Sequence, residues 1–153
     1  MKLVIANDHN GVDLKRHLVA HLSQLGHEVI DLGSDTKETT HSAFYAVEAC
    51  QYVKQGDARF GILICGTGVG MSICANKVNG IRAVLGSDGY TVKQSREHND
   101  TNILALGALT TDRVKAAELV TTWIHTQFDD SVKRRLRLGF IQDIEADQTL
   151  RRS

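Results

Sequence analysis

The chain has 153 residues, of which 42% are hydrophobic and 24% are charged. These fractions are ordinary for a globular protein, and the length is typical of one domain that buries a core without metal or disulfides. Eighteen acidic residues balance eighteen basic ones, so the net charge favours neither nucleic acid nor an anionic membrane as a partner. No apolar run approaches the ~20 residues of a membrane span, and the first residues do not resemble a signal peptide. We therefore expect a single domain over residues 1–153, located in the cytoplasm.

The three cysteines, Cys50, Cys65 and Cys74, are an odd number and have no CxxC spacing. This pattern argues against a disulfide framework and against a zinc site. Cys50 and Cys74 lie on apolar helical spacings, which predicts that both belong to the core. We expect neither a metal nor a cofactor.

Short apolar runs alternate with amphipathic stretches along the chain. The runs predict strands at residues 2–6, 27–32, 60–64, 81–85 and 103–106. The stretches between and after them predict helices at residues 12–25, 43–55, 70–77, 90–97 and about 112–127. A last helix, over residues 131–146 of a C-terminal segment 131–148, has no strand after it, and we expect this segment to pack on a partner subunit.

Strands that alternate with helices are typical of a parallel sheet covered on both faces. We therefore predict an α/β fold, a Rossmann-like three-layer sandwich with a five-stranded parallel sheet and an extra C-terminal helix. Ligands of such sheets bind outside the carboxyl ends of the strands, so the polar residues that follow each strand are the first candidates for a site.

The most informative stretch is FGILICGTGVGMSICANK, residues 60–77. An apolar strand ends at Cys65, a glycine-rich turn follows, and a helical pattern begins at Met71. Glycines let backbone N–H groups approach an anion closely, and a helix N-terminus adds positive charge. A tight turn without a ligand and a buried, inert cysteine are the plainer interpretations of the separate parts. Together they favour an enzyme, because a thiol in this place has reason to ionise.

Other polar groups are weaker candidates by themselves. Asp8 and His9 follow the first strand, although an aspartate in that place can simply cap the next helix. The stretch 96–100, which includes His98 and Asn99, is a polar connection before the fifth strand, where a histidine is usually solvated. The basic run 133–137 would normally be a solvated helix face, but two of its cations lie one turn apart and could clamp a phosphate.

These stretches resemble the ribose-5-phosphate isomerase B family, which also includes allose-6-phosphate and galactose-6-phosphate isomerases. The resemblance covers nearly the whole chain, in the matching stretches 6–9, 29–33, 61–70, 75–77, 80–83 and 95–102. ICGTGxG followed by RxHND is its most specific part.

The resemblance implies aldose–ketose isomerisation of a sugar phosphate through an enediolate, without metal. Cys65 then moves a proton between C1 and C2, Thr67 forms hydrogen bonds near it, His98 opens the furanose ring and Asp8 contacts the sugar. The turn Gly66, Thr67, Gly68, Val69 and Gly70 then stabilises the oxyanion, and the phosphate contacts come from His9, Asn99, Lys133, Arg134 and Arg137. Family members are dimers or tetramers with shared sites, so the resemblance also implies a homodimer or homotetramer.

Three places depart from the family pattern. His41 and Ser42 stand where the family commonly has aspartate and tyrosine. Leu109 stands where an arginine usually follows the fifth strand. The C-terminal segment is one residue longer, so Lys133 or Arg134 takes the place of one expected arginine, and Arg137 matches the other.

We therefore predict an isomerase that interconverts ribose 5-phosphate and ribulose 5-phosphate. Because the departures lie on the substrate side, an isomerase of another phosphorylated aldose is an alternative, as is a non-catalytic sugar-phosphate binding protein. A tetrose 4-phosphate cannot close a furanose ring and needs no ring-opening acid, so the presence of His98 favours a pentose or hexose phosphate.

Overall fold

The five apolar runs form one parallel sheet in the computed structural model, which describes residues 1–147. The strand order is β2-β1-β3-β5-β4, and every neighbouring pair is parallel. The strands are β1 (Lys2–Asn7), β2 (Glu28–Asp31), β3 (Phe60–Cys65), β4 (Ala83–Leu85) and β5 (Ile103–Gly107). The chain leaves β1 for β2 on one side and returns to β3 on the other, so the order reverses between β1 and β3. This reversal is the place where a parallel sheet opens a crevice for a ligand.

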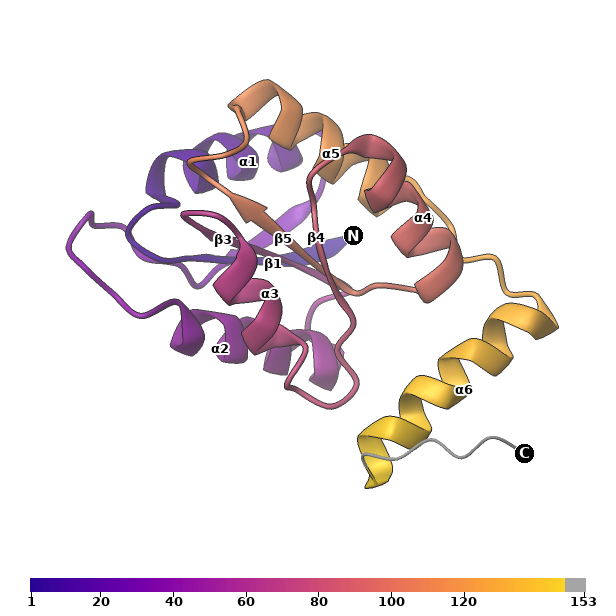
Figure 1. The fold of residues 1–153 in the computed structure, drawn as a ribbon. Coiled ribbons are helices and arrows are strands. Elements are labelled where there is room, and N and C mark those ends of the chain that lie inside the picture. Colours follow the sequence, from indigo (N-terminus) through magenta and orange to yellow (C-terminus); the bar gives the residue numbers. More distant parts are fainter. Residues whose placement is uncertain (148–153) are drawn as a thin grey trace.

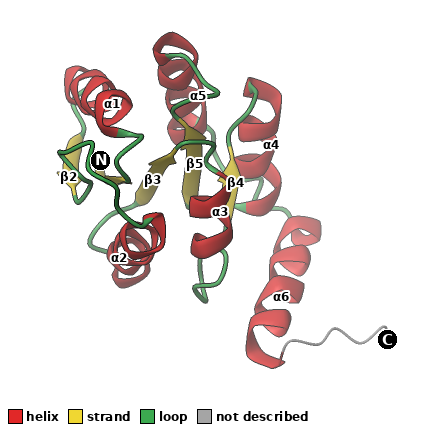
Figure 2. Ribbon diagram, turned by 60° about the vertical axis from the view of Figure 1, so that its left-hand side comes forward, coloured by secondary structure: helices red, strands yellow, loops and turns green. Residues whose placement is uncertain are grey.

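Helices cover both faces of the sheet (Figures 1 and 2). One face carries α1 (Val12–Gln24), α4 (Gly89–Asn99) and α5 (Arg113–His125), and the other carries α2 (Ser42–Gln55) and α3 (Val69–Ala75). Successive strand residues point to opposite faces, so β3 divides its side chains between two cores. Ile62 and Ile64 pack with α1, α4 and α5, whereas Leu63 and Cys65 pack with α2 and α3.

The last helix, α6 (Val132–Asp147), stands away from the sandwich beside the end of α4 (Figures 1 and 2). None of its residues is buried. An apolar stripe at four-residue spacing is exposed along it, formed by Val132, Leu136, Phe140 and Ile144. A helix of this length is marginal in water without a packing surface. Residue 148 of the predicted C-terminal segment lies outside the described residues.

The predicted α/β fold and its five-stranded parallel sheet are confirmed, and most helix and strand ends lie within two residues of their predicted positions. One helix end differs in a way that matters for the site: α4 continues past the predicted end at residue 97 to Asn99, so His98 and Asn99 belong to its last turn and not to a connecting loop. In the described part of the chain, no helix has the length and apolar character needed to cross a membrane.

A buried lysine holds the loop between β2 and α2. The Lys15 side chain is only 1% exposed, and its Nζ donates to the carbonyl of Ser34 at 3.0 Å. The same ammonium pairs with Asp35 at 2.7 Å and with Asp31 at 3.1 Å. Because this loop leads to Thr40, which contacts His9, the lysine fixes one wall of the region described below.

Replacing Lys15 by methionine keeps most of the apolar stem and removes the charge. We expect the free energy of unfolding to fall by about 2–3 kcal/mol, because a buried carbonyl and the two carboxylates lose their partner. Urea denaturation of wild type and Lys15→Met measures the loss. Lys93→Met is the control, since its ion pair with Glu97 is solvent-exposed and should contribute less than about 1 kcal/mol. Equal losses in the two variants would contradict the structural role of Lys15.

Candidate active site

The thiol of Cys65 lies at the carboxyl end of β3, beside the reversal of strand order. Cys65 is 6% exposed, and its Sγ accepts a hydrogen bond from the Gly68 N–H at 3.1 Å. An N–H donated to sulfur stabilises negative charge there, as a base or nucleophile requires. Cys50 lies in the core as predicted, and burial raises the pKa of its thiol to about 12.

Gly68 is required by the shape of this turn. Its φ is +79°, which side chains rarely adopt, and an added Cβ would lie 2.6 Å from Leu85 Cδ1 and 2.9 Å from the Leu106 carbonyl carbon. The turn therefore packs directly on β4 and β5. This close packing holds the Gly68 N–H against the sulfur.

Several N–H groups of the turn remain available to a ligand. Val69 donates to Thr67 Oγ1 at 3.4 Å, and Gly68 donates to Cys65. The N–H groups of Gly66, Thr67 and Gly70 donate to no acceptor within residues 1–147. Backbone donors fixed beside a thiol are suited to stabilise an oxyanion that forms next to it.

Asp8 and His9 reach the same edge from β1. The Asp8 N–H donates to the Ile64 carbonyl at 3.1 Å, and Asp8 Oδ1 accepts from the Asn10 N–H at 2.9 Å. His9 is held by a reciprocal pair of bonds with Thr40: its N–H donates to Thr40 Oγ1, and its Nδ1 accepts from the Thr40 N–H, both at 3.2 Å. Because Nδ1 accepts from an amide, the ring hydrogen of a neutral His9 is on Nε2.

A cleft of about 560 Å³ opens beside the turn, between the N-termini of α1 and α5. We name it the α1/α5 cleft. Its lining includes His9, Asn10, Asp13, Leu14, Lys37, Ala108, Leu109, Thr111, Asp112 and Arg113. Arg113 was not among the residues predicted for the site, although it belongs to a polar run, residues 110–113, that follows the fifth strand as other polar candidates follow theirs. Among the described residues, no group of three or more His, Cys, Asp or Glu side chains could hold a metal ion.

His41 and Ser42, the two residues at the start of α2 that depart from the family pattern, have different surroundings. A Cβ added at Gly70 would lie 3.6 Å from Ser42 Oγ, so Ser42 borders the glycine turn. His41 is exposed and its ring lies against Phe44, with ring centroids 6.4 Å apart. Of these two departures, Ser42 is therefore the one beside the turn.

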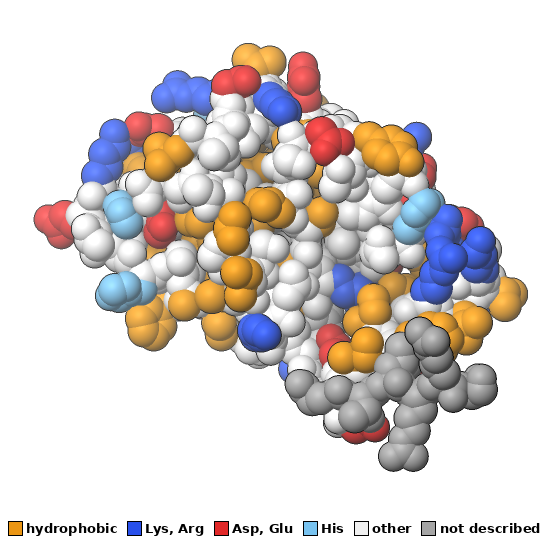
Figure 3. All heavy atoms as spheres, in the orientation of Figure 1, with side chains coloured by type: hydrophobic (Ala, Val, Ile, Leu, Met, Phe, Trp, Pro, Cys, Tyr) orange, Lys and Arg blue, Asp and Glu red, His pale blue; other side chains and the backbone are white. Residues whose placement is uncertain are grey.

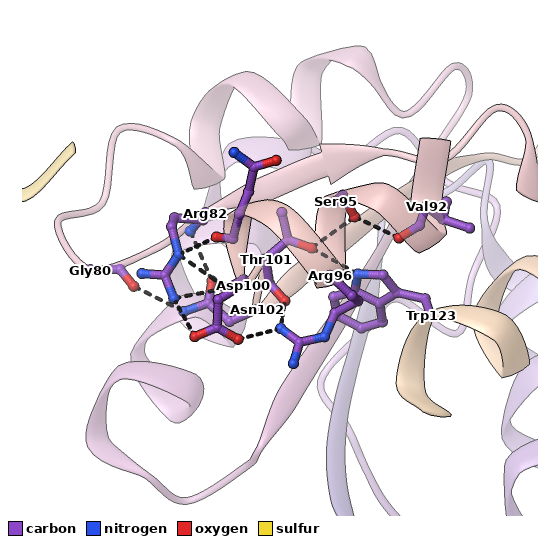
Figure 4. Close-up of polar contacts among 10 residues, drawn as sticks. Gly80, Arg82, Val92, Ser95, Arg96, Asp100, Thr101, Asn102 and Trp123 are labelled. Carbon is purple, nitrogen blue, oxygen red and sulfur yellow. Dashed lines mark hydrogen bonds and ion pairs between the residues drawn. The ribbon is translucent and has the colours of Figure 1, made fainter. Parts of the chain in front are cut away.

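His98 and Asn99 lie at the opposite edge of the sheet, at the end of α4. A polar network fixes this end (Figure 4). Arg82 Nε donates to the Asn99 carbonyl at 2.9 Å, and Arg96 pairs with Asp100 at 2.6 Å. Asp100 ends the helix in the left-handed region with a φ of 45°, held by both arginines.

The basic residues of α6 lie near the same end of α4. The Asp129 N–H donates to the Glu97 carbonyl at 3.0 Å and Asp129 pairs with Arg134 at 3.5 Å, which brings the start of α6 beside His98. Lys133 and Arg137 are exposed, and Figure 3 shows a group of Lys and Arg side chains next to a histidine where α4 meets α6.

The predicted site residues thus form two separate groups within one chain. The five residues of β5 alone extend roughly 13 Å from the edge near Asn99 to the edge where Gly107 pairs with Cys65. The thiol, the turn, Asp8 and His9 form one group, and His98, Asn99, Lys133, Arg134 and Arg137 form the other. One chain does not bring His98 to Cys65.

Comparison with known proteins identifies the family. The family description Ribose/Galactose Isomerase matches residues 3–139. Ribose-5-phosphate isomerase B of Escherichia coli strain K12 is 45% identical over 144 residues, which cover 94% of this chain and 96% of the relative. D-erythrulose-4-phosphate isomerase of Pectobacterium atrosepticum is 34% identical, with 97% of this chain and 99% of the relative covered.

The solved structure of Clostridium thermocellum ribose-5-phosphate isomerase B is similar over 97% of this chain and 100% of that chain, with a TM-score of 0.94 and 41% identity. The chain therefore belongs to the Ribose/Galactose Isomerase family, as a sugar-phosphate isomerase related to the ribose-5-phosphate isomerases B.

Proposed function

We propose that the protein interconverts ribose 5-phosphate and ribulose 5-phosphate through an enediolate. The observation that carries the proposal is the environment of Cys65, whose sulfur accepts the Gly68 N–H at 3.1 Å beside the unpaired N–H groups of the turn. The names of the Escherichia coli and Clostridium thermocellum relatives support ribose 5-phosphate as the substrate.

The chemistry follows from this geometry. The Cys65 thiolate removes the proton from C2 of the open-chain aldose, and negative charge moves to O1. The N–H groups of Gly66, Thr67 and Gly70 stabilise that charge as it forms. The proton then returns to C1 and the hydroxyl hydrogen on O2 passes to O1, which yields the ketose without any external oxidant or reductant. Asp8 contacts the sugar hydroxyls and Thr67 supports the turn.

A complete site needs the second group of residues from another copy of the chain. In our proposal His98 of a partner opens the furanose ring, and Asn99, Lys133, Arg134 and Arg137 of the partner join His9 around the phosphate. The exposed apolar stripe of α6 supports a partner of this kind, because none of the α6 residues is buried within the described range 1–147. The C-terminal segment thus packs on the partner in a homodimer or homotetramer.

Another phosphorylated aldose is the second candidate substrate. Ser42 borders the turn and Leu109 lines the cleft, so both departures from the family pattern adjoin the site. A relative that is named for erythrulose 4-phosphate shows that the substrate differs among similar chains. A four-carbon sugar phosphate would make the ring-opening role of His98 unnecessary.

A panel of aldose phosphates tests the proposed reaction. NMR assays should include ribose 5-phosphate, allose 6-phosphate, galactose 6-phosphate and erythrose 4-phosphate. We expect turnover of ribose 5-phosphate, and a loss of about 10²–10⁴-fold in kcat for Cys65→Ala, because a general base contributes that much. Cys74→Ala is the matched control and should keep its activity. A higher kcat/KM on another sugar would favour the second candidate, and a fully active Cys65→Ala variant would exclude Cys65 as the base.

Gly68→Ala should lower kcat by about 10²–10³-fold, since the added Cβ displaces a backbone donor from the thiol. Gly56→Ala is the control, because Gly56 has a similar φ of +84° but nothing within 4 Å of an added Cβ. That variant should lose about 1 kcal/mol of stability and keep its kcat. Equal kcat for both variants would contradict the role of the turn.

Mixed assemblies test whether the site is shared. Cys65→Ala and His98→Gln chains are each expected to be nearly inactive on ribose 5-phosphate. When they are unfolded and refolded together, random pairing should restore about a quarter of wild-type activity, because each mixed dimer has one intact site. Mixing without recovery, in assemblies verified by two affinity tags, would mean that both groups act within one chain.

A further inference from the structure

The α1/α5 cleft adjoins the glycine turn but contains groups that the proposed mechanism does not use. A Cβ added at Gly66 would lie 3.3 Å from Leu109 Cδ1 and 3.6 Å from Asn10 Nδ2, and both of these residues line the cleft. A short sugar with its reacting carbons at Cys65 can therefore extend over Gly66 into the cleft. The group at its far end is the phosphate.

Some charged side chains of the cleft have hydrogen-bond or ion-pair partners and others have none. Lys37 donates to Asp13 at 2.9 Å, and this contact holds the pKa of Asp13 below its ordinary value. Asp112 caps α5, where its Oδ1 accepts from the Lys115 N–H at 2.9 Å. Both carboxylates thus have partners. Arg113 is close enough to Asp13 to interact with its charge, but it forms no hydrogen bond or ion pair with any residue in the described range 1–147.

His9 supplies a second donor to the same cleft. Its Nδ1 is occupied by the Thr40 N–H, so its Nε2 carries the ring hydrogen. The Asn10 side-chain amide, which also lines the cleft, contacts this Nε2 at 3.2 Å, and an anion bound here would replace that contact. An unpaired guanidinium and a fixed imidazole N–H in one cleft suit a phosphate, for which arginine offers two parallel N–H donors. Leu109, which is 75% exposed in the same cleft, offers it no hydrogen bond.

We propose that Arg113 binds the substrate phosphate from within the same chain as Cys65, together with His9. This inference rests on the proposed function. It adds to the site a residue, Arg113, that makes the site specific for a phosphorylated sugar. Arg113 supplies in this cleft the cation that is absent at position 109, where leucine stands in place of the usual arginine.

Steady-state kinetics of Arg113→Leu test the proposal. We expect KM for the sugar phosphate to rise about tenfold, the loss typical of one charge-assisted hydrogen bond, while kcat changes by less than about threefold. Lys115→Leu removes a cation from the same turn of α5 but outside the cleft, and it should keep both constants. An unchanged KM in Arg113→Leu would overturn the proposal, as would an equal rise in Lys115→Leu.

A rescue experiment separates charge from structure. Leu109→Arg added to Arg113→Leu returns a guanidinium to the cleft from a neighbouring position. Recovery of KM to within about threefold of wild type supports a direct contact with phosphate. A KM that stays raised in the double variant would mean that Arg113 acts in some other way and would overturn the proposal.

Direct titration with inorganic phosphate, followed by phosphorus NMR, keeps this inference distinct from the proposed reaction. Binding to wild type that weakens about tenfold in Arg113→Leu supports the phosphate contact, even if no sugar of the panel is turned over. In that case the proposed function would fail and the contact would stand. Equal phosphate affinity of the two proteins, or no measurable binding by wild type, would overturn the inference.

Discussion

The common direction of all five strands decides where each candidate functional group lies. Every strand ends at the same edge of the sheet, so Cys65 and Asp8 meet there although more than fifty residues separate them. The same constraint sends the end of α4, with His98, to the other edge, because α4 runs back to the start of β5. In a parallel sheet, a residue that ends a strand and a residue that ends the following helix cannot belong to the same cluster.

Close packing around the glycine turn fixes the backbone N–H groups next to the Cys65 thiol. The turn presses on Leu85 and Leu106, which leaves room for hydrogen at Gly68 and nothing larger. The backbone donors near Cys65 are therefore fixed before any substrate arrives. Preorganised donors need no reorganisation as charge develops, and for this reason they stabilise an oxyanion better than water does.

Much of the fold could be predicted from the sequence because hydrophobic periodicity reports burial directly. The runs at Lys2–Asn7 and Phe60–Cys65 are buried strands, and Cys65 lies at a strand end as expected. The predicted helix ended one residue before His98, although Arg96 and Asp100 stand at the i,i+4 spacing of a helical ion pair. The second contact that holds Asp100 comes from Arg82, 18 residues away, and hydrophobic periodicity does not show it. The pairing of His9 with Thr40 was not predicted, because it is a tertiary contact between separate loops. Arg113 could have been found from the polar run that follows the fifth strand, but its place in the cleft depends on how α1 and α5 pack.

The exposed position of α6 bears on the order in which the protein forms. The two cores of the sandwich are built from residues that precede α6, so they can assemble by a unimolecular process within one chain. In the assembly that we propose, α6 becomes buried only when two chains meet, which is a bimolecular step with a rate that depends on concentration. A dilute solution of refolded chains would then contain a finished sheet and a finished glycine turn long before it contains an active enzyme.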